Sequence, residues 1–524
     1  MTTRLLILGG LLLGTGAAFG QTGSIYADAA FQYNEIQQSG TARFRGIGGN
    51  HTALGGDAST LFGNPAGLGF YNRSELSFSP TFLNNSSQTS YLGSTTTDSR
   101  GRVAVGQLGL ILAGGDNGNS NRRWRRTTFG VGYHQNINFN NGFTFEGLNR
   151  RSSLVDNLID DANSIQGLTG GQLNNGYDPN TRQADDLLAA AYQLYLVNGT
   201  PDAQGNNTRA PFFSYDLLNP RSQQNTFESS GSQSQWTVAY AGNLDDKLYL
   251  GINVGLSRLR YNSDNVLTEV IQGGNSFGDI GQRDRLTVSG NGINATLGAI
   301  YKLTPSVQIG ATVASPNFMR VTETFTQNLR VNPIDPNLAN LIVGELDATD
   351  VDVAPNDFDY TITGPLRASG GATVFLGGGK IGFLTASAEY VGYAGMRANT
   401  TGGNASDNSA FRNNVRNTVQ QSYQNVVNVR AGAEFRAGMF RIRGGAAYLP
   451  DADISRRDNI DRTRLLISGG LGYRNDRFFA DVSGTFNTTE AAFTPYTRPN
   501  PADYGSALIN NKLSAITLSL GTFF

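Results

Sequence analysis

The feature that most constrains this chain is an alternation of apolar and other side chains that recurs along most of its length. Between Leu248 and Leu256 five aliphatic residues occupy every second position, with a tyrosine, an asparagine and two glycines between them. Side chains two apart share one face of a β-strand, so this is strand periodicity. The same pattern returns at 293–301, 307–313, 427–435, 440–448, 465–473, 478–486 and 516–520. The chain is predicted to be all-β.

The residues on the second face of these strands distinguish a soluble all-β protein from a membrane barrel. It carries Asn428, Arg430, Glu434, Arg436, Arg441, Arg443, Asp481, Ser483 and Thr485. A soluble sandwich or a lipocalin-like barrel also alternates, but its second face would be a solvated surface around one packed core. An apolar face toward lipid and a polar face toward a lumen account for both faces together. The sequence therefore predicts a transmembrane antiparallel β-barrel.

Connection lengths give independent support. Tight links at 244–246, 304–305, 377–379, 437–438 and 475–476 alternate with polar stretches near 262–286, 321–365, 394–424, 450–461 and 489–512. Bacterial outer-membrane barrels have short periplasmic turns and long outer loops. Counting strands from Glu75, with a very long loop near 139–233, gives about 14, and an even number places both termini in the periplasm. After residue 20 no run approaches the roughly 18 apolar residues of a membrane helix.

The two ends of the chain carry export and assembly signals. Arg4, the apolar stretch Leu5 to Leu13, and small residues at Ala18 and Gly20 predict a signal peptide at 1–20. A buried helix is the alternative, but the stretch is short and glycine-rich. Phe524 ends the last predicted strand in phase with its apolar face, and a terminal aromatic resembles the signal read by the barrel assembly machinery. We expect localisation in the cell outer membrane.

Composition argues against most kinds of catalytic and metal-binding site. The chain has no cysteine, which rules out disulfides, thiol catalysis, cysteine-ligated metals and a lipoprotein anchor. It has two histidines, His51 and His134, too few for a histidine-cluster metal site and a poor basis for a Ser-His-Asp triad. A net charge of -1 gives no electrostatic reason to bind nucleic acid. We predict no enzyme activity, no catalytic residue, no cofactor and no metal.

Two segments fall outside the strand pattern. Residues about 150–200 have helical spacing, and within them Leu187, Leu188, Tyr192 and Tyr195 are candidates for an outer groove that captures ligand, or else simply pack the loop. Residues 21–74 are too irregular for a strand and too rich in glycine for a helix. A barrel of about 14 strands leaves lumen space, so this segment is predicted to be a plug. The domains are then 1–20, 21–74 and a barrel at 75–524.

One stretch of the plug carries a family resemblance. Residues 41–59 read TARFRGIGGNHTALGGDAS, and Asn64-Pro65-Ala66-Gly67-Leu68 follows just before the first strand. This stretch resembles the hatch of the FadL-type long-chain fatty acid transporters, a family that includes importers of aromatic hydrocarbons. Segments 292–305, 314–316 and 428–436 support the resemblance. By composition alone, Asn64-Pro65 is also an ordinary turn signal.

The resemblance implies a 14-stranded barrel closed by a hatch. A hydrophobic ligand would be captured among the outer loops, pass to an inner pocket, and leave after a hatch rearrangement through a gap in the wall. Asp57, Asn64, Pro65 and Ala66 would belong to the hatch and its gating. The outer loops depart from the best-known members, since they are long and rich in Asn, Gln and Ser.

Four arginines are predicted to face the lumen: Arg430, Arg436, Arg441 and Arg443. A guanidinium can hold a ligand carboxylate through two charge-assisted hydrogen bonds. Glu389, Glu434 and Asp481 are predicted to face inward too, so ion-pair ladders that stiffen the wall or bind the plug are the other reading.

The leading hypothesis from the sequence is passive uptake of hydrophobic small molecules, with long-chain fatty acids or aromatic hydrocarbons as the ligand. Transfer of each methylene out of water contributes roughly 0.8 kcal/mol, so uptake needs no ATP. A general diffusion porin and a surface adhesin or receptor on a barrel scaffold stay open as alternatives. A TonB-dependent receptor is disfavoured, because its 22 strands and separate plug need a longer chain. Expected partners also include outer-membrane lipid and lipopolysaccharide, around a monomer.

Overall fold

A computed structural model describes residues 19–35, 37–114, 123–201, 208–454 and 460–524. The predicted signal peptide falls almost wholly outside these residues. Among the described helices, none is both long enough and apolar enough to span a bilayer.

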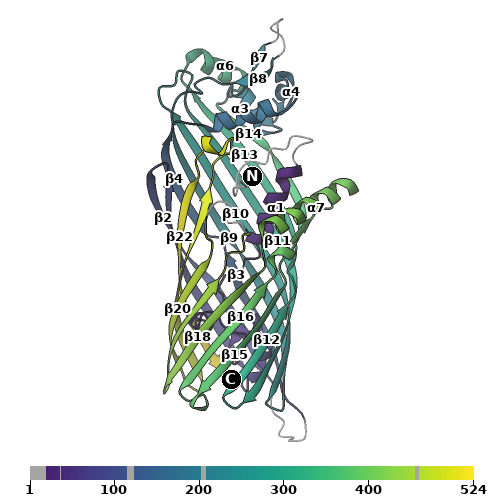
Figure 1. Ribbon diagram of the computed structural model, residues 1–524, viewed down its shortest axis with the longest axis vertical. Helices are drawn as coiled ribbons and strands as arrows, with labels where there is room; N and C mark the ends of the chain where they lie inside the picture. Colours follow the sequence, from purple (N-terminus) through teal and green to yellow (C-terminus); the bar gives the residue numbers. More distant parts are fainter. Residues whose placement is uncertain (1–18, 36, 115–122, 202–207, 455–459) are drawn as a thin grey trace.

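The wall is a closed antiparallel barrel of fourteen strands (Figure 1). Closure comes from β1 pairing with β22, from Glu75↔Phe523 to Ser90↔Leu508. Four wall positions are interrupted and therefore carry two labels each. In order around the barrel the strands are β1 (Glu75–Tyr91), β2 (Ser94–Ala113), β3 (Trp124–Asn138) with β4 (Asn141–Asn149), β9 (Arg221–Leu244), β10 (Leu248–Ile271), β11 (Phe277–Thr304), β12 (Val307–Ala314) with β13 (Phe318–Pro333), β15 (Arg367–Leu376) with β14 (Asp350–Thr363), β16 (Gly382–Val391) with β17 (Arg397–Asn399), β18 (Val426–Ala437), β19 (Phe440–Leu449), β20 (Arg464–Arg474), β21 (Phe478–Phe493) and β22 (Ala507–Phe523).

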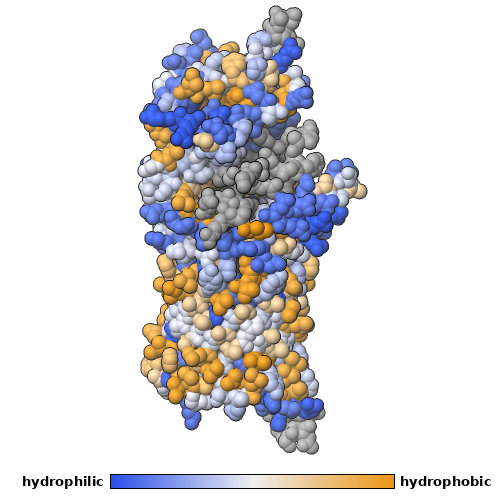
Figure 2. Space-filling view, viewed as in Figure 1, coloured by the Kyte–Doolittle hydropathy of each residue, from blue (hydrophilic) through white to orange (hydrophobic). Residues whose placement is uncertain are grey.

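The alternation read from the sequence sorts side chains as predicted. On β10 the aliphatic residues from Leu250 to Leu256 point outward and are exposed, whereas Asn253 and Ser257 are buried on the inner face. Apolar residues gather over the lower part of the barrel, while its upper part mixes hydrophilic and apolar residues and the projecting helix α7 (Ala405–Ser422) is largely hydrophilic (Figure 2). Large apolar side chains exposed around a whole barrel are stable only in lipid. The prediction of an all-β transmembrane barrel is confirmed.

The wall is much taller on one side than on the other. Strands β10 and β11 contain 24 and 28 residues, although roughly 9–11 suffice to cross a bilayer. On the opposite side β18, β19 and β20 contain 12, 10 and 11 residues. The prediction of long loops near 262–286, 321–365 and 139–233 is therefore wrong in large part. Beyond the bilayer the outward face is mainly polar, whereas apolar residues such as Leu267 and Ile271 face inward toward the cap. The apolar-outward alternation therefore ends, while ladder pairs such as Asn262↔Thr287 continue.

The outer ends of the tall strands carry a cap with its own apolar core. Its helices within 150–200 occur where helical spacing predicted them, whereas the helix at 336–346 lies in a stretch that was expected to be loop. These helices pack around Leu158, Leu188, Ala190, Leu194 and Ile342. The elements of the cap are α3 (Leu154–Ser164), α4 (Gly170–Asn175), β5 (Tyr177–Asp178), β6 (Gln183–Ala184), α5 (Leu187–Gln193), β7 (Asn198–Pro201), β8 (Thr208–Phe213), α6 (Pro336–Leu346) and η5 (Pro501–Asp503). Two further 3-10 turns, η3 (Gly377–Gly379) and η4 (Tyr393–Gly395), lie between wall strands.

The segment before β1 runs along the lumen. Its elements are α1 (Phe19–Gln32), α2 (Ala42–Gly46), η1 (Ala58–Leu61) and η2 (Pro65–Phe70). We call residues 40–71 the hatch; α2, η1 and η2 are buried within the half of the barrel that carries the short turns. Ser74 and Phe524 exchange backbone hydrogen bonds of 3.0 Å where the wall closes.

Helix α1 departs from the expectation that the N-terminal end lies in the periplasm. It sits in the outer half, beside α7 (Figure 1). Its Tyr26 ring packs edge-on against Phe411 of α7, with 5.0 Å between centroids, and its hydroxyl donates to Glu323 of β13 at 2.9 Å. Burial of this aromatic face, which strand periodicity does not register, holds α1 there.

Candidate functional site

The Asn64-Pro65-Ala66 turn is the best-anchored part of the hatch. Asn64 is fully buried and caps η2, accepting from the Ala66 amide at 3.1 Å. Its Nδ2 donates to the Thr52 carbonyl at 2.6 Å and, more weakly, to the Ala299 carbonyl of the wall at 3.3 Å. One side chain thus joins two parts of the hatch and fastens them to β11.

Inward-facing glycines on three adjacent strands create the seat for this turn. A Cβ on Gly298 would lie 2.0 Å from Asn64 Oδ1, and one on Gly251 would lie 2.4 Å from the Pro65 carbonyl carbon. A Cβ on Gly310 would lie 2.0 Å from the Thr52 carbonyl oxygen. Any larger residue at these places would push the hatch off the wall.

Asp57 joins the first turn of the hatch to η1. Its carboxylate caps η1 by accepting from the Ser59 amide at 2.8 Å. It also accepts from the Thr41 hydroxyl at 2.9 Å, and the Arg43 guanidinium is 4.0 Å away. Asp57 is therefore an internal brace of the hatch.

Two of the predicted lumenal arginines, together with one from the hatch, share a single carboxylate. Glu434 lies 2.8 Å from Arg443, 3.0 Å from Arg436 and 3.4 Å from Arg43 of the hatch. Arg443 also reaches Asp481 at 2.6 Å. Because breaking one partner of a buried ion pair leaves an uncompensated charge, this network resists separation of hatch and wall.

The other two predicted arginines lie elsewhere. Arg430 pairs with Glu389 at 2.8 Å, and Arg367 lies 3.6 Å from the same carboxylate. Arg441 is next to the short turn between β18 and β19, where it donates to the carbonyls of Gly438 and Phe440. Of the four, Arg430 alone lines the cavity described next.

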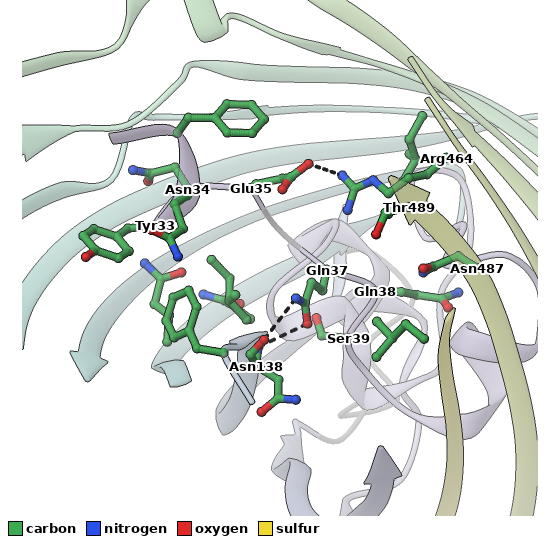
Figure 3. A pocket seen from close by; sticks show the side chains of 18 of the residues that line it. Tyr33, Asn34, Glu35, Gln37, Gln38, Ser39, Asn138, Arg464, Asn487 and Thr489 are labelled. Carbon is green, nitrogen blue, oxygen red and sulfur yellow. Dashed lines mark hydrogen bonds and ion pairs between the residues drawn. The ribbon is translucent and has the colours of Figure 1, made fainter. Parts of the chain in front are cut away.

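A cavity of about 710 Å³ lies above the hatch, inside the barrel. Its lining combines apolar side chains, among them Phe139, Tyr261 and Leu286, with many amides. The close-up shows Gln37, Gln38, Asn138 and Asn487 around this space, with the Glu35–Arg464 ion pair at its edge (Figure 3). Pockets of roughly 300–1,000 Å³ are usual for small-molecule ligands.

The wall beside the cavity is interrupted. In the described chain β2 and β3 pair only from Gln107↔His134 to Ala113↔Thr128, although β2 continues outward to Ser94. Higher up the two sides meet again where the Thr144 amide donates to Asp98 at 2.7 Å. We call the stretch between residues 101–106 of β2 and 135–141 of β3 and β4 the side gap.

Local sequence explains why the ladder fails at this height. Pro80 on β1 lacks an amide hydrogen and coincides with a bulge opposite Gly106 of β2. The ladder between β3 and β9 shifts register between Gln135 and Ile137. Outward-facing Val103 and Val105 show that this height lies within the apolar belt. The cavity reaches Gly106 and residues 135–141, so it borders both sides of the side gap.

Gln37 occupies the edge of β3 that has lost its partner. The side-chain Nε2 of Gln37 donates to the Asn138 carbonyl at 3.2 Å, and its Oε1 accepts from the Asn138 backbone amide at 3.1 Å. Its backbone amide donates to the Asn136 carbonyl at 3.2 Å. Figure 3 shows the paired contacts of Gln37 and Asn138. The segment leading to the hatch thus stands in for a neighbouring strand at the side gap.

The cavity floor contains a guanidinium without an acidic partner. Arg45 of α2 is buried and donates to the Thr517 hydroxyl at 3.0 Å and to the Gln38 carbonyl. Among the described residues no carboxylate lies within ion-pair distance of it, and burial lowers the pKa of Arg45 to about 10. Nearby His51 also lines the cavity, and burial lowers its pKa to about 4. Arg45 is therefore a buried cation whose charge no neighbour neutralises.

The residues predicted to form an outer groove lie in the cap. Leu187 and Leu188 are buried in its core. The Tyr192 hydroxyl is 3.1 Å from that of Thr208, and the Tyr195 hydroxyl donates to Glu345. None of the four residues lines the cavity found among the described residues. The two leucines pack within the cap core and form no exposed groove in this structure.

The resemblance implied a gap in the wall, but sequence reasoning missed its position and the roles of Gln37 and Arg45. A proline within a strand pattern, Pro80, and a glycine on the next strand, Gly106, could have predicted a bulge at this height. Gln37 and Arg45 gave no signal, because their roles depend on segments about 100 and 470 residues away. In the described part of the chain no group of three His, Cys, Asp or Glu residues could hold a metal ion.

Together the fold and the site define a class: a fourteen-stranded membrane barrel with a hatch, an internal cavity and an interrupted wall. Among solved structures, the chain is similar to the Pseudomonas putida toluene transporter TodX, at 14% identity and a TM-score of 0.52, over 93% of this chain and 99% of that one. It is also similar to a Pseudomonas aeruginosa FadL homologue, at 12% identity and a TM-score of 0.52, over 93% and 99% of the two chains. No family model and no curated protein matches the chain. The chain has the fold of the FadL-type channels, and the resemblance found at the hatch is confirmed at the level of the fold.

Proposed function

We propose that this protein is an outer-membrane channel of the FadL type that takes up hydrophobic small molecules passively. The observation that carries the proposal is the cavity of about 710 Å³, which is enclosed below by the hatch and bordered by the side gap. Apolar surface from Phe139, Tyr261 and Leu286 would receive the ligand. Burial of apolar surface contributes roughly 25 cal/mol per Å², so the cavity can concentrate such a ligand without an energy source.

The exit is proposed to be the side gap. A ligand that leaves between β2 and β3 enters the apolar belt directly, next to Val103 and Val105, and need not cross the polar rim. Gln37 must give up its bonds to Asn138 for this path to open. Because Gln37 immediately precedes the hatch, movement of the hatch would uncover the gap.

We further propose that the ligand carries a carboxylate, as long-chain fatty acids do. The support is Arg45, whose buried charge lacks a partner among the described residues. A ligand carboxylate at the cavity floor would neutralise it while the acyl chain lies along the apolar lining. The toluene transporter TodX shares the fold, so an aromatic hydrocarbon is the alternative ligand.

The test is ligand binding by purified barrel in nanodiscs. We expect oleate to bind and Arg45→Gln to weaken oleate binding by about 10- to 100-fold, since hydrogen bonds to charged groups contribute roughly 1.5–3 kcal/mol. Methyl oleate lacks the charge and should bind both proteins equally. Preference for toluene over oleate, unchanged by Arg45→Gln, would select the aromatic alternative. Failure to bind any of the three would refute the channel proposal.

A general diffusion porin is the second candidate, because many side chains that line the cavity are amides, such as Asn136, Asn428 and Asn487. Planar-bilayer recording separates the two. A porin would give steady ion conductance that apolar ligands leave unchanged, whereas the hatch-closed channel should conduct little.

A further inference from the structure

Three arginines project from the outer surface of the barrel just above its apolar belt. Arg258 and Arg260 follow the outward aliphatic run that ends at Leu256 on β10, and Arg320 follows Phe318 on β13. The ladder register places Arg258 opposite Asn291 of β11, and Asn291 opposite Arg320. Strands lie about 4.8 Å apart, so Arg258 and Arg320 are roughly 10 Å apart, and Arg260 is about 7 Å further along β10.

The surface directly below this group is apolar. Leu256, Ile293 and Phe318 occupy the adjacent row in the same register, and about half of each side chain is exposed. A cationic row over an apolar row matches an amphiphile whose headgroup is anionic and whose chains run down the barrel wall.

The three arginines differ from others on β11 and β13 in having no ion-pair partner among the described residues. Higher on β11, Arg283 and Arg285 both pair with Asp264. Higher on β13, Arg330 pairs with Asp279 at 2.9 Å. Among the described residues no carboxylate lies within ion-pair distance of Arg258, Arg260 or Arg320.

The outward acidic residue closest in register to Arg320 is otherwise engaged. Asp359 of β14 lies two residue pairs above Arg320, opposite Thr322, and accepts from the Thr322 hydroxyl at 2.5 Å. The charge of the three guanidinium groups is therefore left for a ligand from outside the chain.

We propose that Arg258, Arg260 and Arg320 bind the phosphate groups of a phosphorylated glycolipid of the outer leaflet. A guanidinium presents two parallel donors to a phosphate, and Asn291 adds a neutral amide between the two strands. The acyl chains of the lipid lie on Leu256, Ile293 and Phe318. The site orders lipid at one face of the barrel and is independent of the channel cavity.

Native mass spectrometry of the full barrel, released from detergent with added lipid, tests the proposal. The probes are lipid A with its phosphates, the same lipid after dephosphorylation, and inorganic phosphate. The test variant is Arg258→Gln/Arg260→Gln, and Arg320→Gln is added to it in a triple variant. The matched control is Arg283→Gln/Arg285→Gln, which also removes two outward guanidinium groups two residues apart on one strand. Because these positions are exposed, all variants should insert normally.

We expect wild-type protein to retain phosphorylated lipid A about tenfold better than the dephosphorylated form. The double and triple variants should lose this preference stepwise, and the control should keep it. Equal retention of the two lipids by wild-type protein would overturn the proposal. So would equal losses in the control, or displacement of the lipid by millimolar inorganic phosphate, which would indicate a site for free anions.

Discussion

Replacement of Gln37 by alanine should loosen the edge of β3 at the side gap. The change removes the paired hydrogen bonds between the Gln37 amide and the Asn138 backbone, which measure 3.2 and 3.1 Å. It keeps the backbone bond to the Asn136 carbonyl. The N-terminal segment therefore stays in place while its hold on the gap weakens.

The magnitude follows from two neutral hydrogen bonds. Each contributes roughly 0.5–1.5 kcal/mol net, so Gln37→Ala should cost about 2 kcal/mol of local stability. Since 1.4 kcal/mol is a factor of ten, the open population at the gap should rise about 30-fold. The Asn138 amide, which donates to Gln37 Oε1, reports this opening directly.

Hydrogen exchange of the peptide that contains Asn138 is the assay. Exchange there should accelerate about 30-fold in Gln37→Ala if opening and closing are fast compared with exchange. Gln88→Ala is the control, because Gln88 is exposed on β1 and its side chain has no hydrogen bond among the described residues. Uptake of oleate by cells with equal surface levels should rise in parallel. Exchange and uptake identical to those of Gln88→Ala would refute the role of Gln37 as the latch of the gap.

Four further predictions concern the hatch and the end of the wall. Burial lowers the pKa of half-buried His51 to about 4, so the neutral imidazole favours the docked hatch. Hatch docking should be strongest above about pH 6.5 and weaken by at most ~3 kcal/mol as pH falls toward 4. Hydrogen exchange of the hatch amides should show this dependence, and His51→Gln should abolish it. Gly298→Ala places a Cβ 2.0 Å from Asn64 Oδ1, so hatch exchange should rise more than tenfold, whereas Gly370→Ala, with open space around the new Cβ, should leave it unchanged. Asn64→Ala should alter uptake more than assembly; normal uptake by inserted protein would contradict this. Deletion of Phe524, whose backbone closes the wall, should reduce insertion without changing ligand preference, as surface labelling and uptake would show.

The membrane-spanning part of this barrel could be predicted from the sequence because lipid imposes a simple rule. Outward side chains must be apolar and inward ones need not be, so strands such as β10 and β20 can be recognised from an apolar residue at every second position. That rule stops where the strands leave the bilayer. The outer half of β11 was therefore mistaken for loop, since its stability there comes from ladder hydrogen bonds and from the cap.

The hatch could be located from its motif, but its attachment could not. Asn64 and Asp57 were singled out, and both are buried within the hatch. The wall partners of Asn64, such as Gly298 and the Ala299 carbonyl, lie over 230 residues away and have no recognisable sequence signal.

By itself the sequence determined the number and direction of the strands, the lipid-facing surface and the presence of a hatch, because each depends on local composition and period. The tertiary structure decided where the wall is open and what closes it. The side gap results from irregularities on β1, β2 and β3 that meet at one height, and Gln37 closes it from a segment that strand periodicity left unassigned. Such contacts depend on how distant segments align in the closed barrel, which only the assembled ladder fixes.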